Sequence, residues 1–406
     1  MSSTLNFLPA EEPHIGARIK VAGIGGAGGN AVDRMIVSGL NGVDFLTINT
    51  DAQALDKSRA PNKIQIGRQL TKGLGAGANP EIGKEAAEQD AESIEEQLKD
   101  ADLVFITAGM GGGTGTGAAP RAAEIAQKNG ALTVAIVTKP FLFEGRRRMS
   151  VAETGIKELR ERVDTLIVIP NQQLLSIADA NTTLLMAFET ADSILTQATR
   201  GISDLIAIPG IVNLDFADVK SVMEGMGDAL MGIGVAVGDD RGPQAAKQAI
   251  TCPLLKDVSI DGAQGVLINV TGSSNMTLFE VNEAASVAYE AAGERANVIF
   301  GAVIDDEAGD EIRVTVIATG FNSTANIAKN LQPDRSYDFR PKKKADLRVP
   351  TILRKSEDTD VVVTGMGGNG NKNNNHKGKR IHLGEIDLNA EPPDLSLPAF
   401  LRRNNG

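Results

Sequence analysis

Apolar runs alternate with amphipathic segments from about residue 18 to residue 320. Short runs rich in β-branched residues predict buried strands, and apolar positions repeated at helix spacing predict helices. In the first half, strands are expected at 18–25, 43–49, 102–108, 132–138 and 165–169, and helices at 30–37, 80–98, 116–128, 149–162 and 182–200. Because these strands are apolar without interruption, we expect a parallel sheet covered by helices on both faces.

A second pattern of strands and helices follows Pro209. Strands are expected at 231–237, 265–271, 298–303 and 312–318, and helices at 217–224, 244–250 and 278–292. This pattern predicts a second, smaller α/β domain with a mixed sheet, and the alternative is that all strands belong to one large domain. The helix at 182–200 has apolar residues on more than one side, so we expect it to form a spine between the two halves.

The periodicity stops after Gly320. Residues 321–391 are polar, rich in asparagine and without core-forming runs, so they are expected to form a disordered linker, and residues 1–14 a disordered extension. Residues 392–406 regain apolar side chains, followed by two arginines. Apolar anchors beside two cations favour a peptide that docks on a partner, and the alternative is an unstructured remainder.

The composition narrows the classes of function. The 406 residues are 42% hydrophobic, and they contain neither a run of about 18 apolar residues nor a basic start followed by an apolar stretch. We therefore expect neither secretion nor a membrane span, and the single Cys252 suits a reducing, cytoplasmic compartment. The three histidines, His14, His376 and His382, lie near the ends of the chain, which argues against a histidine-dependent triad or a zinc site in the folded body.

Charge is distributed unevenly along the chain. Residues 321–406 carry 15 Lys and Arg against 10 Asp and Glu, which leaves 26 against 42 for residues 1–320. The chain also has no Trp and only two Tyr for stacking on bases. The acidic body is therefore expected to repel nucleic acid.

The residues after the first predicted strand, from Gly23 to Gly28, match the G-x-G-x-x-G pattern. Glycine is needed in such a loop because a Cβ would hold the backbone away from a phosphate, and the following helix directs free N–H groups at the anion. Asp51 follows the second strand at the spacing of a ribose-binding carboxylate. This motif alone leaves open a dinucleotide, another nucleotide and a tight turn.

Two further glycine-rich segments favour a triphosphate over a pyrophosphate. Residues 111–117, GGGTGTG, join a strand to a helix with five glycines in seven residues, which costs too much chain entropy for ordinary structure. Residues 73–80, GLGAGANP, precede a helix with Pro80 in its first turn. Backbone N–H groups and threonine hydroxyls of 111–117 are expected to wrap the polyphosphate. No lysine lies in these loops, so backbone dipoles and Mg²⁺ are expected to balance the phosphate charge.

Patterns of other nucleotide-binding families are incomplete in this chain. Gly83 and Lys84 lack the earlier glycine of a Walker A loop and are followed by Glu85. Residues 62–65, NKIQ, look like the guanine-reading N-K-x-D box, but Gln65 replaces the carboxylate that accepts the guanine N–H groups. We interpret this match as coincidence.

The GGGTGTG loop is the signature of the tubulin and FtsZ superfamily. The surrounding sequence resembles the FtsZ family in NTDAQAL at 49–55, GLGAGANP at 73–80, TAGMGGGTGTGAAP at 107–120 and NLDFADVK at 213–220. The resemblance covers residues 15–320, and LPAFLRR at 397–403 is similar to the C-terminal partner-binding peptide of the family. The chain departs from the family at Ala27, within the first glycine run, and at Gln172 after Asn171, where many relatives have aspartate.

The resemblance implies an α/β, tubulin-like fold and a role in division. Residues 15–181 would form a Rossmann-like GTP-binding domain with a parallel sheet, 182–208 the central helix and 209–320 the C-terminal GTPase-activating domain. The expected activity is hydrolysis of GTP to GDP and phosphate, activated by head-to-tail polymerisation into the filaments of the bacterial division ring. Expected partners are further copies of the chain, and division proteins and membrane tethers that bind from Leu395 to Arg403, in the cytoplasm at mid-cell beneath the inner membrane.

The resemblance also assigns the nucleotide site, position by position. Residues expected at the phosphates are Gly25, Gly26, Ala27, Gly28, Gly29 and Asn30, then Gly77, Ala78 and Asn79, and then Gly112, Gly113, Thr114, Gly115, Thr116 and Gly117. Glu144 and Arg148 would lie by the ribose and phosphates, and Asn171, Phe188 and Asp192 would border the guanine. From the residues alone, an exposed ion pair between Glu144 and Arg148 is the favoured alternative.

Hydrolysis needs a positioned water, which phosphate loops that only donate hydrogen bonds do not supply. The resemblance assigns this task to Asp215 and Asp218, assisted by Asn213, on a loop that reaches the nucleotide of the neighbouring subunit. From the residues alone, helix capping is favoured, because Asp215 precedes a predicted helix and Asp218 lies in its first turn.

Two competing functions stay open at the level of sequence. An NAD-dependent oxidoreductase is supported by the first glycine motif and Asp51, and it is weakened by the second glycine loop and the lack of a histidine in the body. The other is a non-catalytic scaffold that binds a nucleotide only to stabilise its fold.

Overall fold

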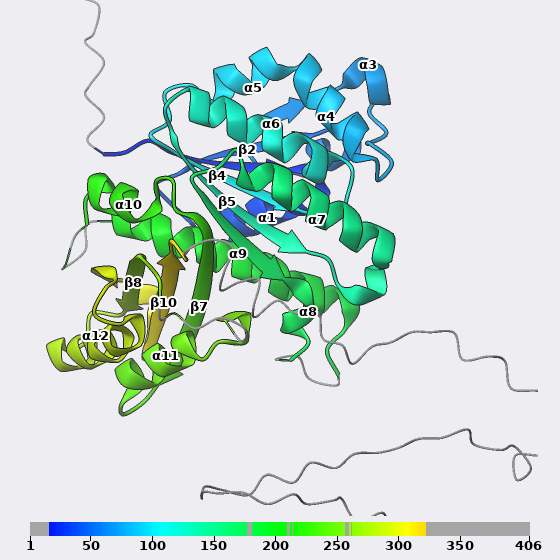
Figure 1. Ribbon diagram of the computed structural model, residues 1–406. Coiled ribbons are helices and arrows are strands. Elements are labelled where there is room, and N and C mark those ends of the chain that lie inside the picture. The colour runs from blue at the N-terminus through cyan, green and yellow to red at the C-terminus, as the bar shows by residue number, and fades with distance from the viewer. Residues whose placement is uncertain are drawn as a thin grey trace, which may run out of the picture. The chain divides into compact units, whose positions relative to one another are not determined.

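A continuous ten-stranded sheet forms the centre of the molecule (Figure 1). The computed structural model describes residues 16–176, 181–208, 212, 214–255, 260 and 262–321. The strand order is β3-β2-β1-β4-β5-β6-β7-β10-β8-β9. The strands are β1 (Ile19–Ile24), β2 (Asp44–Asn49), β3 (Asn62–Gln65), β4 (Leu103–Gly109), β5 (Leu132–Lys139), β6 (Thr165–Pro170), β7 (Gly227–Val237), β8 (Gly265–Gly272), β9 (Asn297–Ile304) and β10 (Glu311–Thr319). The sheet is mixed but mostly parallel, because only β10 runs against its neighbours β7 and β8.

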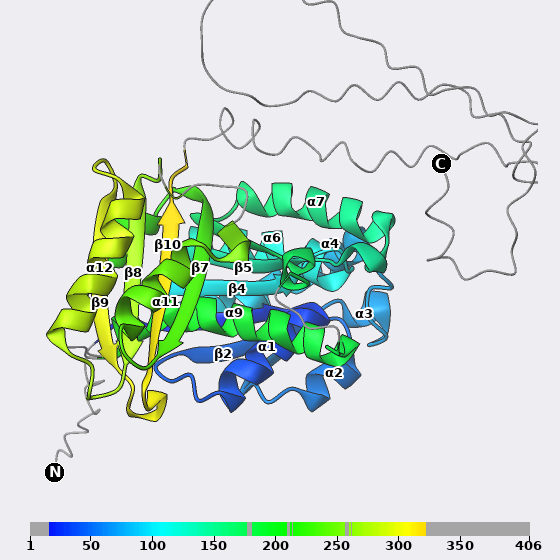
Figure 2. The ribbon, with the colours of Figure 1, turned by 90° about the horizontal axis from the view of Figure 1, so that it is seen from below.

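Helices cover both faces of this sheet. Figures 1 and 2 show α4 to α7 on one face and α1 and α9 on the other. The longer helices are α1 (Gly25–Val37), α4 (Pro80–Gln89), α5 (Ala91–Leu98), α6 (Thr114–Lys128), α7 (Arg146–Arg160), α9 (Leu184–Ala207), α10 (Phe216–Met223), α11 (Arg241–Ile250) and α12 (Leu278–Ala292). The shorter helices are α2 (Ala52–Lys57), α3 (Arg68–Thr71), α8 (Asn171–Leu174), and the 3₁₀ turns η1 (Leu142–Glu144), η2 (Pro253–Leu255) and η3 (Asp306–Ala308).

The uninterrupted apolar strands explain why both faces are covered. Successive side chains of a strand point to opposite faces. In β4, Leu103 and Phe105 pack in the apolar cluster that includes α1 and α9, whereas Val104 and Ile106 pack in the cluster that includes α4 to α7. Both faces of such a strand must be removed from water, which confirms the expected parallel sheet between two helical layers.

Each strand expected from the sequence is present, but several helix boundaries were wrong. α1 begins at Gly25 rather than at residue 30, and α6 at Thr114 rather than at residue 116, so the first turns of both helices contain glycines of the loops. The single helix expected at 80–98 is two helices that meet at Asp90, whose carboxylate accepts a hydrogen bond from Gly67 N (2.6 Å). The short edge strand β3 was not expected, and it contains the NKIQ segment.

The helix α9 runs from the carboxyl ends of the parallel strands to their amino ends. Its 24 residues correspond to a length of about 36 Å. Near its start, Phe188 packs against Phe141, which follows β5. At its end, Ala207 packs so closely on Gly42, just before β2, that a Cβ on the glycine would lie 2.6 Å from the alanine Cβ. In the second half of the chain, Asn269 Nδ2 of β8 donates to the Gly201 carbonyl oxygen of α9 (3.1 Å), so the helix contacts both halves as expected of a spine, and it extends beyond the predicted residue 200.

The two halves of the chain join through three residue pairs between β6 and β7, so they share one sheet. The domain boundaries 15–181, 182–208 and 209–320 remain a division based on sequence. The expected N-terminal extension 1–14, the linker after Phe321 and the docking peptide 392–406 lie outside the described residues.

Candidate functional site

Three glycine-rich segments pack directly against one another where β1 and β4 end. These are the start of α1, the start of α6 with the residues before it, and the turn 73–79 that precedes α4. A Cβ on Gly25 would lie 2.8 Å from Gly115 N, and a Cβ on Gly113 would lie 2.8 Å from the Cβ of Ala76. No side chain fits in either place, so glycine at these positions is what allows the three segments to meet.

A second group of glycines faces open space instead. No atom lies within 4 Å of a Cβ built on Gly26, Gly29, Gly77 or Gly112. These positions expose the backbone on the side of the site that a ligand would reach. Of the other predicted phosphate-binding residues, Ala27, Asn30, Ala78 and Asn79 are exposed, while Gly28 and Gly117 are buried against neighbouring backbone.

The starts of α1 and α6 offer unpaired N–H groups to an anion. Neither helix has a side chain that caps its first turn, and both begin at this edge. Free N–H groups at the positive end of a helix dipole bind phosphate well. The helix α4 differs, because Asn79 Oδ1 already accepts a hydrogen bond from Glu81 N (3.1 Å).

The two threonine hydroxyls of the GGGTGTG loop are engaged within the protein. Thr114 Oγ1 lies 2.7 Å from Thr50 Oγ1, and Thr116 Oγ1 accepts a hydrogen bond from Gly111 N (2.8 Å). Both threonines are less than 10% exposed. They hold the loop in shape, so the groups left for phosphate are mainly backbone N–H groups. Thr50 was missed at the level of sequence, although it directly follows a predicted strand that ends at the same edge.

Glu144 and Arg148 form an ion pair beside the second glycine loop. Glu144 Oε2 lies 3.0 Å from Arg148 Nη1, and the Glu144 side chain is 8% exposed against 51% for Arg148. The other carboxylate oxygen of Glu144 accepts a hydrogen bond from Phe141 N (2.8 Å). Arg148 also touches the loop, because a Cβ on Gly111 would lie 2.8 Å from Arg148 Cγ. The favoured alternative, an ion pair, is thus present, but it is partly buried and adjoins the predicted phosphate site.

Aromatic and amide side chains line the other side of this edge. Phe141 stacks on Phe143 (ring centroids 5.0 Å apart) and meets the edge of Phe188 (5.5 Å). Asn171 is 5% exposed, and its Oδ1 has no hydrogen-bond partner among the described residues. A buried amide oxygen without a partner is costly, and a ligand N–H would satisfy it. Gln172, which stands where relatives have aspartate, accepts a hydrogen bond from Leu142 N (3.0 Å) and so joins α8 to η1.

The carboxyl of Asp192 in α9 is perturbed by its surroundings. Burial raises its pKa to about 6, while nearby Arg34 lowers the pKa and Glu189 raises it by smaller amounts. Arg34 and Glu189 form their own ion pair at 3.5 Å. A buried carboxylate whose charge Arg34 offsets only in part suits a ligand that brings hydrogen-bond donors.

Asp51, the candidate ribose-binding carboxylate, is engaged in capping α2. Its Oδ1 accepts hydrogen bonds from Gln53 N (2.9 Å) and Ala54 N (3.2 Å). This contact weakens the main sequence argument for a dinucleotide.

Asp215 and Asp218 lie at the opposite end of α9. Asp218 N donates to Asp215 Oδ1 (2.8 Å), and Asp215 N donates to Asp218 Oδ2 (3.3 Å), which is the reciprocal pattern of a capping box at the start of α10. The capping role favoured from the residues alone is therefore present. Both residues are exposed, so their remaining carboxylate lone pairs face outward. Asn213 lies outside the described residues.

Among the described residues, no group of three or more His, Cys, Asp or Glu could hold a metal ion by itself. A Mg²⁺ ion here would depend on phosphate oxygens and water for most of its ligands, as Mg²⁺ commonly does.

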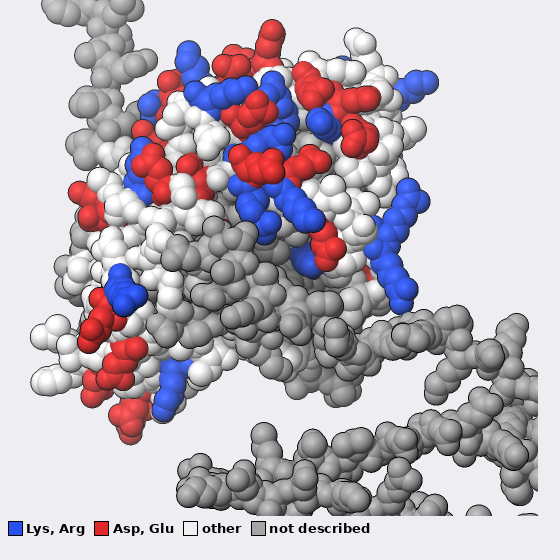
Figure 3. Space-filling view, viewed as in Figure 1, with Lys and Arg blue, Asp and Glu red and all other residues white. Residues whose placement is uncertain are grey.

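On the face drawn in Figure 3, acidic and basic side chains are interspersed over α4 to α7. Ion pairs of these helices include Arg121 with Glu124 in α6 (3.0 Å), and Lys139 of β5 with Glu153 of α7 (2.9 Å).

Comparisons with known proteins match both halves of the chain. Residues 18–179 match the model of the Tubulin/FtsZ family, GTPase domain, and residues 227–322 match that of the FtsZ family, C-terminal domain. An empty FtsZ dimer from M. jannaschii is 47% identical, with a TM-score of 0.74 over 77% of this chain and 90% of that chain. A mutant of M. jannaschii FtsZ is also 47% identical, with a TM-score of 0.73 over 76% of this chain and 92% of that one.

A more distant structure shares the fold alone. CetZ2 from Haloferax volcanii, in a GTPγS-bound protofilament, is 19% identical, with a TM-score of 0.66 over 77% of this chain and 96% of that chain. Within the described part of the chain, no helix combines the length and the apolar character needed to cross a membrane.

Proposed function

Because the chain belongs to the FtsZ family of tubulin-like GTPases, we propose that it polymerises head to tail and hydrolyses GTP where two subunits meet. One subunit grips the nucleotide with the glycine segments at the ends of β1 and β4, which we call the nucleotide edge. The next subunit supplies the carboxylates of Asp215 and Asp218.

The separation of these two half-sites is the observation that carries the proposal. The nucleotide edge adjoins the start of α9, where Phe188 packs on Phe141. Asp215 follows the end of the same helix, with Leu214 packed beside Gly301 of β9. A rigid helix of about 36 Å keeps the two half-sites apart within one chain. A second subunit is therefore the natural source of carboxylates for the γ-phosphate.

The segment with Asp215 and the start of α12 lie at the same end of the strands β8 and β9. Val212 bridges to Ala302 near the end of β9, and β9 and β8 end side by side at Ile304 and Gly272. The turns that follow these strands lead into β10 and α12. We define the distal edge as the described residues of 212–218 together with residues 273–279 and 305–310.

Exposed apolar side chains at both edges support a contact between them. On the distal edge, Leu278 is 82% and Phe279 is 80% exposed. At the nucleotide edge, Leu74 is 81% exposed. In η1 and at the start of α9, which adjoin this edge, the apolar side chains that are more than half exposed are Leu142, Phe143, Leu184, Leu185 and Met186. Large exposed apolar groups commonly mark protein contacts. Two different surfaces at opposite ends of one chain make a head-to-tail contact, which extends into a filament when it does not close on itself.

In the assembled site, each group has a separate task. The N–H groups at the starts of α1 and α6 bind the phosphates, and Arg148 adds positive charge beside Gly111. Asn171 Oδ1 and the Asp192 carboxylate accept hydrogen bonds from the guanine N–H groups. The Asp215 and Asp218 of the next subunit accept hydrogen bonds from the attacking water and aim it at the γ-phosphate, with Asn213 assisting. A Mg²⁺ ion bound beside the glycine segments would offset the phosphate charge.

At the level of the cell, we propose that the filaments form the division ring at mid-cell, beneath the membrane. The family and the sequence of the tail support this role. Residues from Leu395 to Arg403 are the proposed docking peptide for other division proteins and membrane tethers.

The direct test replaces Asp215 by asparagine and measures phosphate release together with light scattering. Asparagine caps a helix as well as aspartate does, so Asp215→Asn removes the charge and keeps α10. We expect normal GTP binding and assembly, and hydrolysis slower by about 100-fold or more. The matched control is Asp228→Asn in β7. The Asp228 carboxylate pairs with Arg160 Nε (2.8 Å), and neither residue belongs to the segment that carries Asp215. Wild-type turnover in Asp215→Asn would refute the assignment.

The two competing functions are tested with the wild-type protein. GTP is expected to raise the melting temperature and NAD to leave it unchanged, because only a ligand that binds the folded state stabilises it. Release of phosphate from GTP excludes a purely structural role for the nucleotide. A shift with NAD alone would favour the oxidoreductase.

A further inference from the structure

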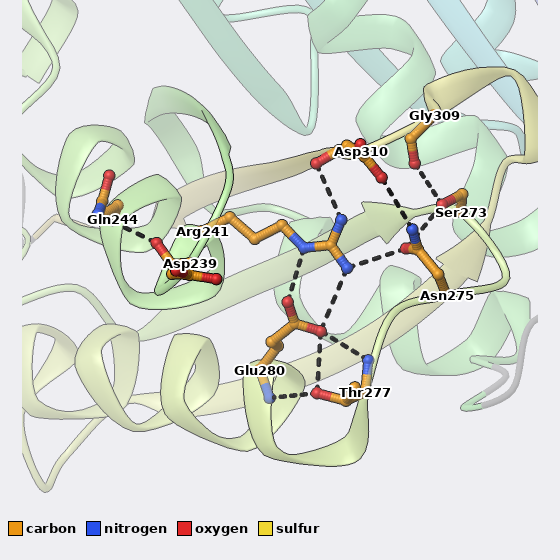
Figure 4. A network of polar contacts seen from close by, with 9 residues as sticks. All are labelled: Asp239, Arg241, Gln244, Ser273, Asn275, Thr277, Glu280, Gly309 and Asp310. Atoms are coloured by element: carbon orange, nitrogen blue, oxygen red, sulfur yellow. Dashed lines mark hydrogen bonds and ion pairs between the residues drawn. The ribbon is translucent and has the colours of Figure 1, made fainter.

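A buried arginine at the start of α11 joins separate segments of the distal edge (Figure 4). Arg241 is 7% exposed. Its Nε donates to Glu280 Oε1 at 2.6 Å and its Nη2 to Glu280 Oε2 at 3.4 Å, in the first turn of α12. Its Nη1 donates to the carbonyl oxygen of Asp310 at 2.9 Å. One guanidinium group therefore links α11, α12 and the turn before β10.

The turn between β8 and α12 belongs to the same network. Asn275 Oδ1 accepts a hydrogen bond from Arg241 Nη2 (2.9 Å), and Asn275 Nδ2 donates to Asp310 Oδ1 (3.1 Å). Ser273 Oγ lies 2.8 Å from Asn275 Oδ1 and also hydrogen-bonds to the Gly309 carbonyl oxygen. Figure 4 shows these groups converging on the guanidinium from different elements. The two turns of the distal edge are thus bound to each other as well as to Arg241.

The helix α12 does not need Arg241 in order to begin. Its first turn has its own capping box, in which Glu280 N donates to Thr277 Oγ1 (3.2 Å) and Thr277 N donates to Glu280 Oε2 (2.7 Å). The hydrogen bond from Arg241, followed by those from Thr277, lowers the pKa of Glu280 to about 2. The ion pair therefore persists at any ordinary assay pH. Its contribution is to fix where the first turn of α12 lies relative to α11 and to the turn 305–310.

The first turn of α12 carries two large apolar side chains that are exposed. Leu278 and Phe279 directly precede Glu280 and are 82% and 80% exposed. A small tilt of the first turn would move both side chains together. The position of the Glu280 carboxylate thus controls how the apolar surface of the distal edge is presented.

We propose that Arg241 is a positioning residue for assembly, which locks the first turn of α12 so that Leu278 and Phe279 fit the nucleotide edge of the next copy. This proposal rests on the proposed function of the distal edge. Arginine is suited to the task because its planar group donates in several fixed directions at once. A lysine at this position could keep the charge but could not reach Glu280, Asn275 and Asp310 together.

The test compares Arg241→Met and Arg241→Lys with the wild-type protein. Two quantities are measured: the affinity for GDP at protein concentrations below assembly, and the threshold concentration above which phosphate is released. We expect GDP affinity to change less than about twofold, and the threshold to rise about tenfold in Arg241→Met and by less in Arg241→Lys. The matched control is Arg160→Met, which also breaks an ion pair (Arg160 Nε to Asp228 Oδ1, 2.8 Å) but lies away from the distal edge. Its threshold should equal that of the wild type.

A mixing experiment separates positioning from a general folding defect. Gly26→Trp places a large side chain in open space at the nucleotide edge. We expect this variant to keep an intact distal edge and to lose GTP binding. Mixed with Arg241→Met, it should restore phosphate release, because its distal edge completes the intact nucleotide edge of the other variant. A misfolded Arg241→Met subunit would not be rescued.

The outcomes distinguish the two levels of the proposal. An unchanged threshold in Arg241→Met, or no recovery in this mixture when Gly26→Trp does restore hydrolysis by Asp215→Asn, overturns the role of Arg241 while the proposed function stands. If the wild-type protein itself has no threshold, the proposed function fails, and the role of Arg241 in assembly fails with it.

Discussion

At the scale of single residues, the missing side chain of a glycine has two different uses at the nucleotide edge. A Cβ on Gly117 would lie 2.0 Å from the carbonyl oxygen of Pro80 and 2.6 Å from Lys84 N, so this glycine lets α6 pack against α4. A Cβ on Gly26 would meet nothing within 4 Å. The first glycine serves the fold and the second serves the ligand.

These uses predict opposite results for two substitutions. Gly117→Ala should destabilise the protein by about 1–3 kcal/mol, because the added methyl group forces the two helices apart. Gly26→Trp should melt close to the wild-type temperature yet lose GTP binding. Thermal melting and nucleotide titration of both variants check this. The account is wrong if Gly26→Trp binds GTP with wild-type affinity.

Asp192 predicts a dependence of nucleotide binding on pH. Burial raises its pKa from 3.8 in the reference state to about 6 in the fold. The folded, ligand-free chain therefore holds more protons than the unfolded chain between these values, and its stability falls as the pH rises through that window. If the ionised carboxylate accepts guanine N–H groups, GDP affinity instead falls as the pH is lowered through about 6.

The matched control for Asp192 lies at the other end of α9. Burial also raises the pKa of Asp204 to about 6. Asp192→Asn should weaken GDP binding by roughly tenfold at neutral pH and flatten its pH profile, because a hydrogen bond to a charged group is lost. Asp204→Asn should leave GDP affinity unchanged. Equal effects of the two substitutions would contradict a role for Asp192 at the guanine.

The glycine segments could be located from the sequence because so many glycines between a strand and a helix are too costly in chain entropy for an ordinary connection. The contacts that hold these segments could not. Thr50 and Thr114 are 64 positions apart in the chain, and Phe141 meets Phe188 only because α9 crosses the end of β5. Such pairs depend on strand order, which the apolar pattern does not determine.

At the scale of elements, the capping box of α10 gives Asp215 a structural role beside its proposed catalytic one. Loss of an aspartate cap costs about 1 kcal/mol, whereas asparagine replaces it well. Asp215→Ala should therefore lower the melting temperature and Asp215→Asn should not, while both lose hydrolysis. Melting curves beside phosphate release measure the two roles separately. If the Asn variant hydrolyses GTP and the Ala variant does not, capping alone explains the residue.

Helix starts were the weakest predictions at this scale. Glycine is a poor helix former, so the pattern placed the start of α1 at residue 30 and that of α6 at residue 116. In the structure these glycines are helical, and their N–H groups form the open starts of α1 and α6. The break at Asp90 was missed because it depends on a hydrogen bond from Gly67, 23 positions earlier.

At the scale of the whole molecule, α9 and the sheet place the two proposed half-sites at opposite ends. The sequence alone could not order the second set of strands, since β10, the last of the described strands in the sequence, lies between β7 and β8. That order puts the turns after β8 and β9 at one edge, together with the segment that carries Asp215. The head-to-tail arrangement was implied by the family resemblance, and the apolar surfaces at the two edges now support it physically.

The central claim, that two subunits share one hydrolytic site, is tested most directly by mixing Asp215→Asn with Gly26→Trp. The first variant has an intact nucleotide edge and the second an intact distal edge, so neither should hydrolyse GTP alone. An equal mixture should recover up to about a quarter of the wild-type rate, because one in four random head-to-tail contacts joins the two intact edges. The claim is contradicted if the mixture stays inactive, or if isolated wild-type subunits hydrolyse GTP at a full rate that does not depend on concentration.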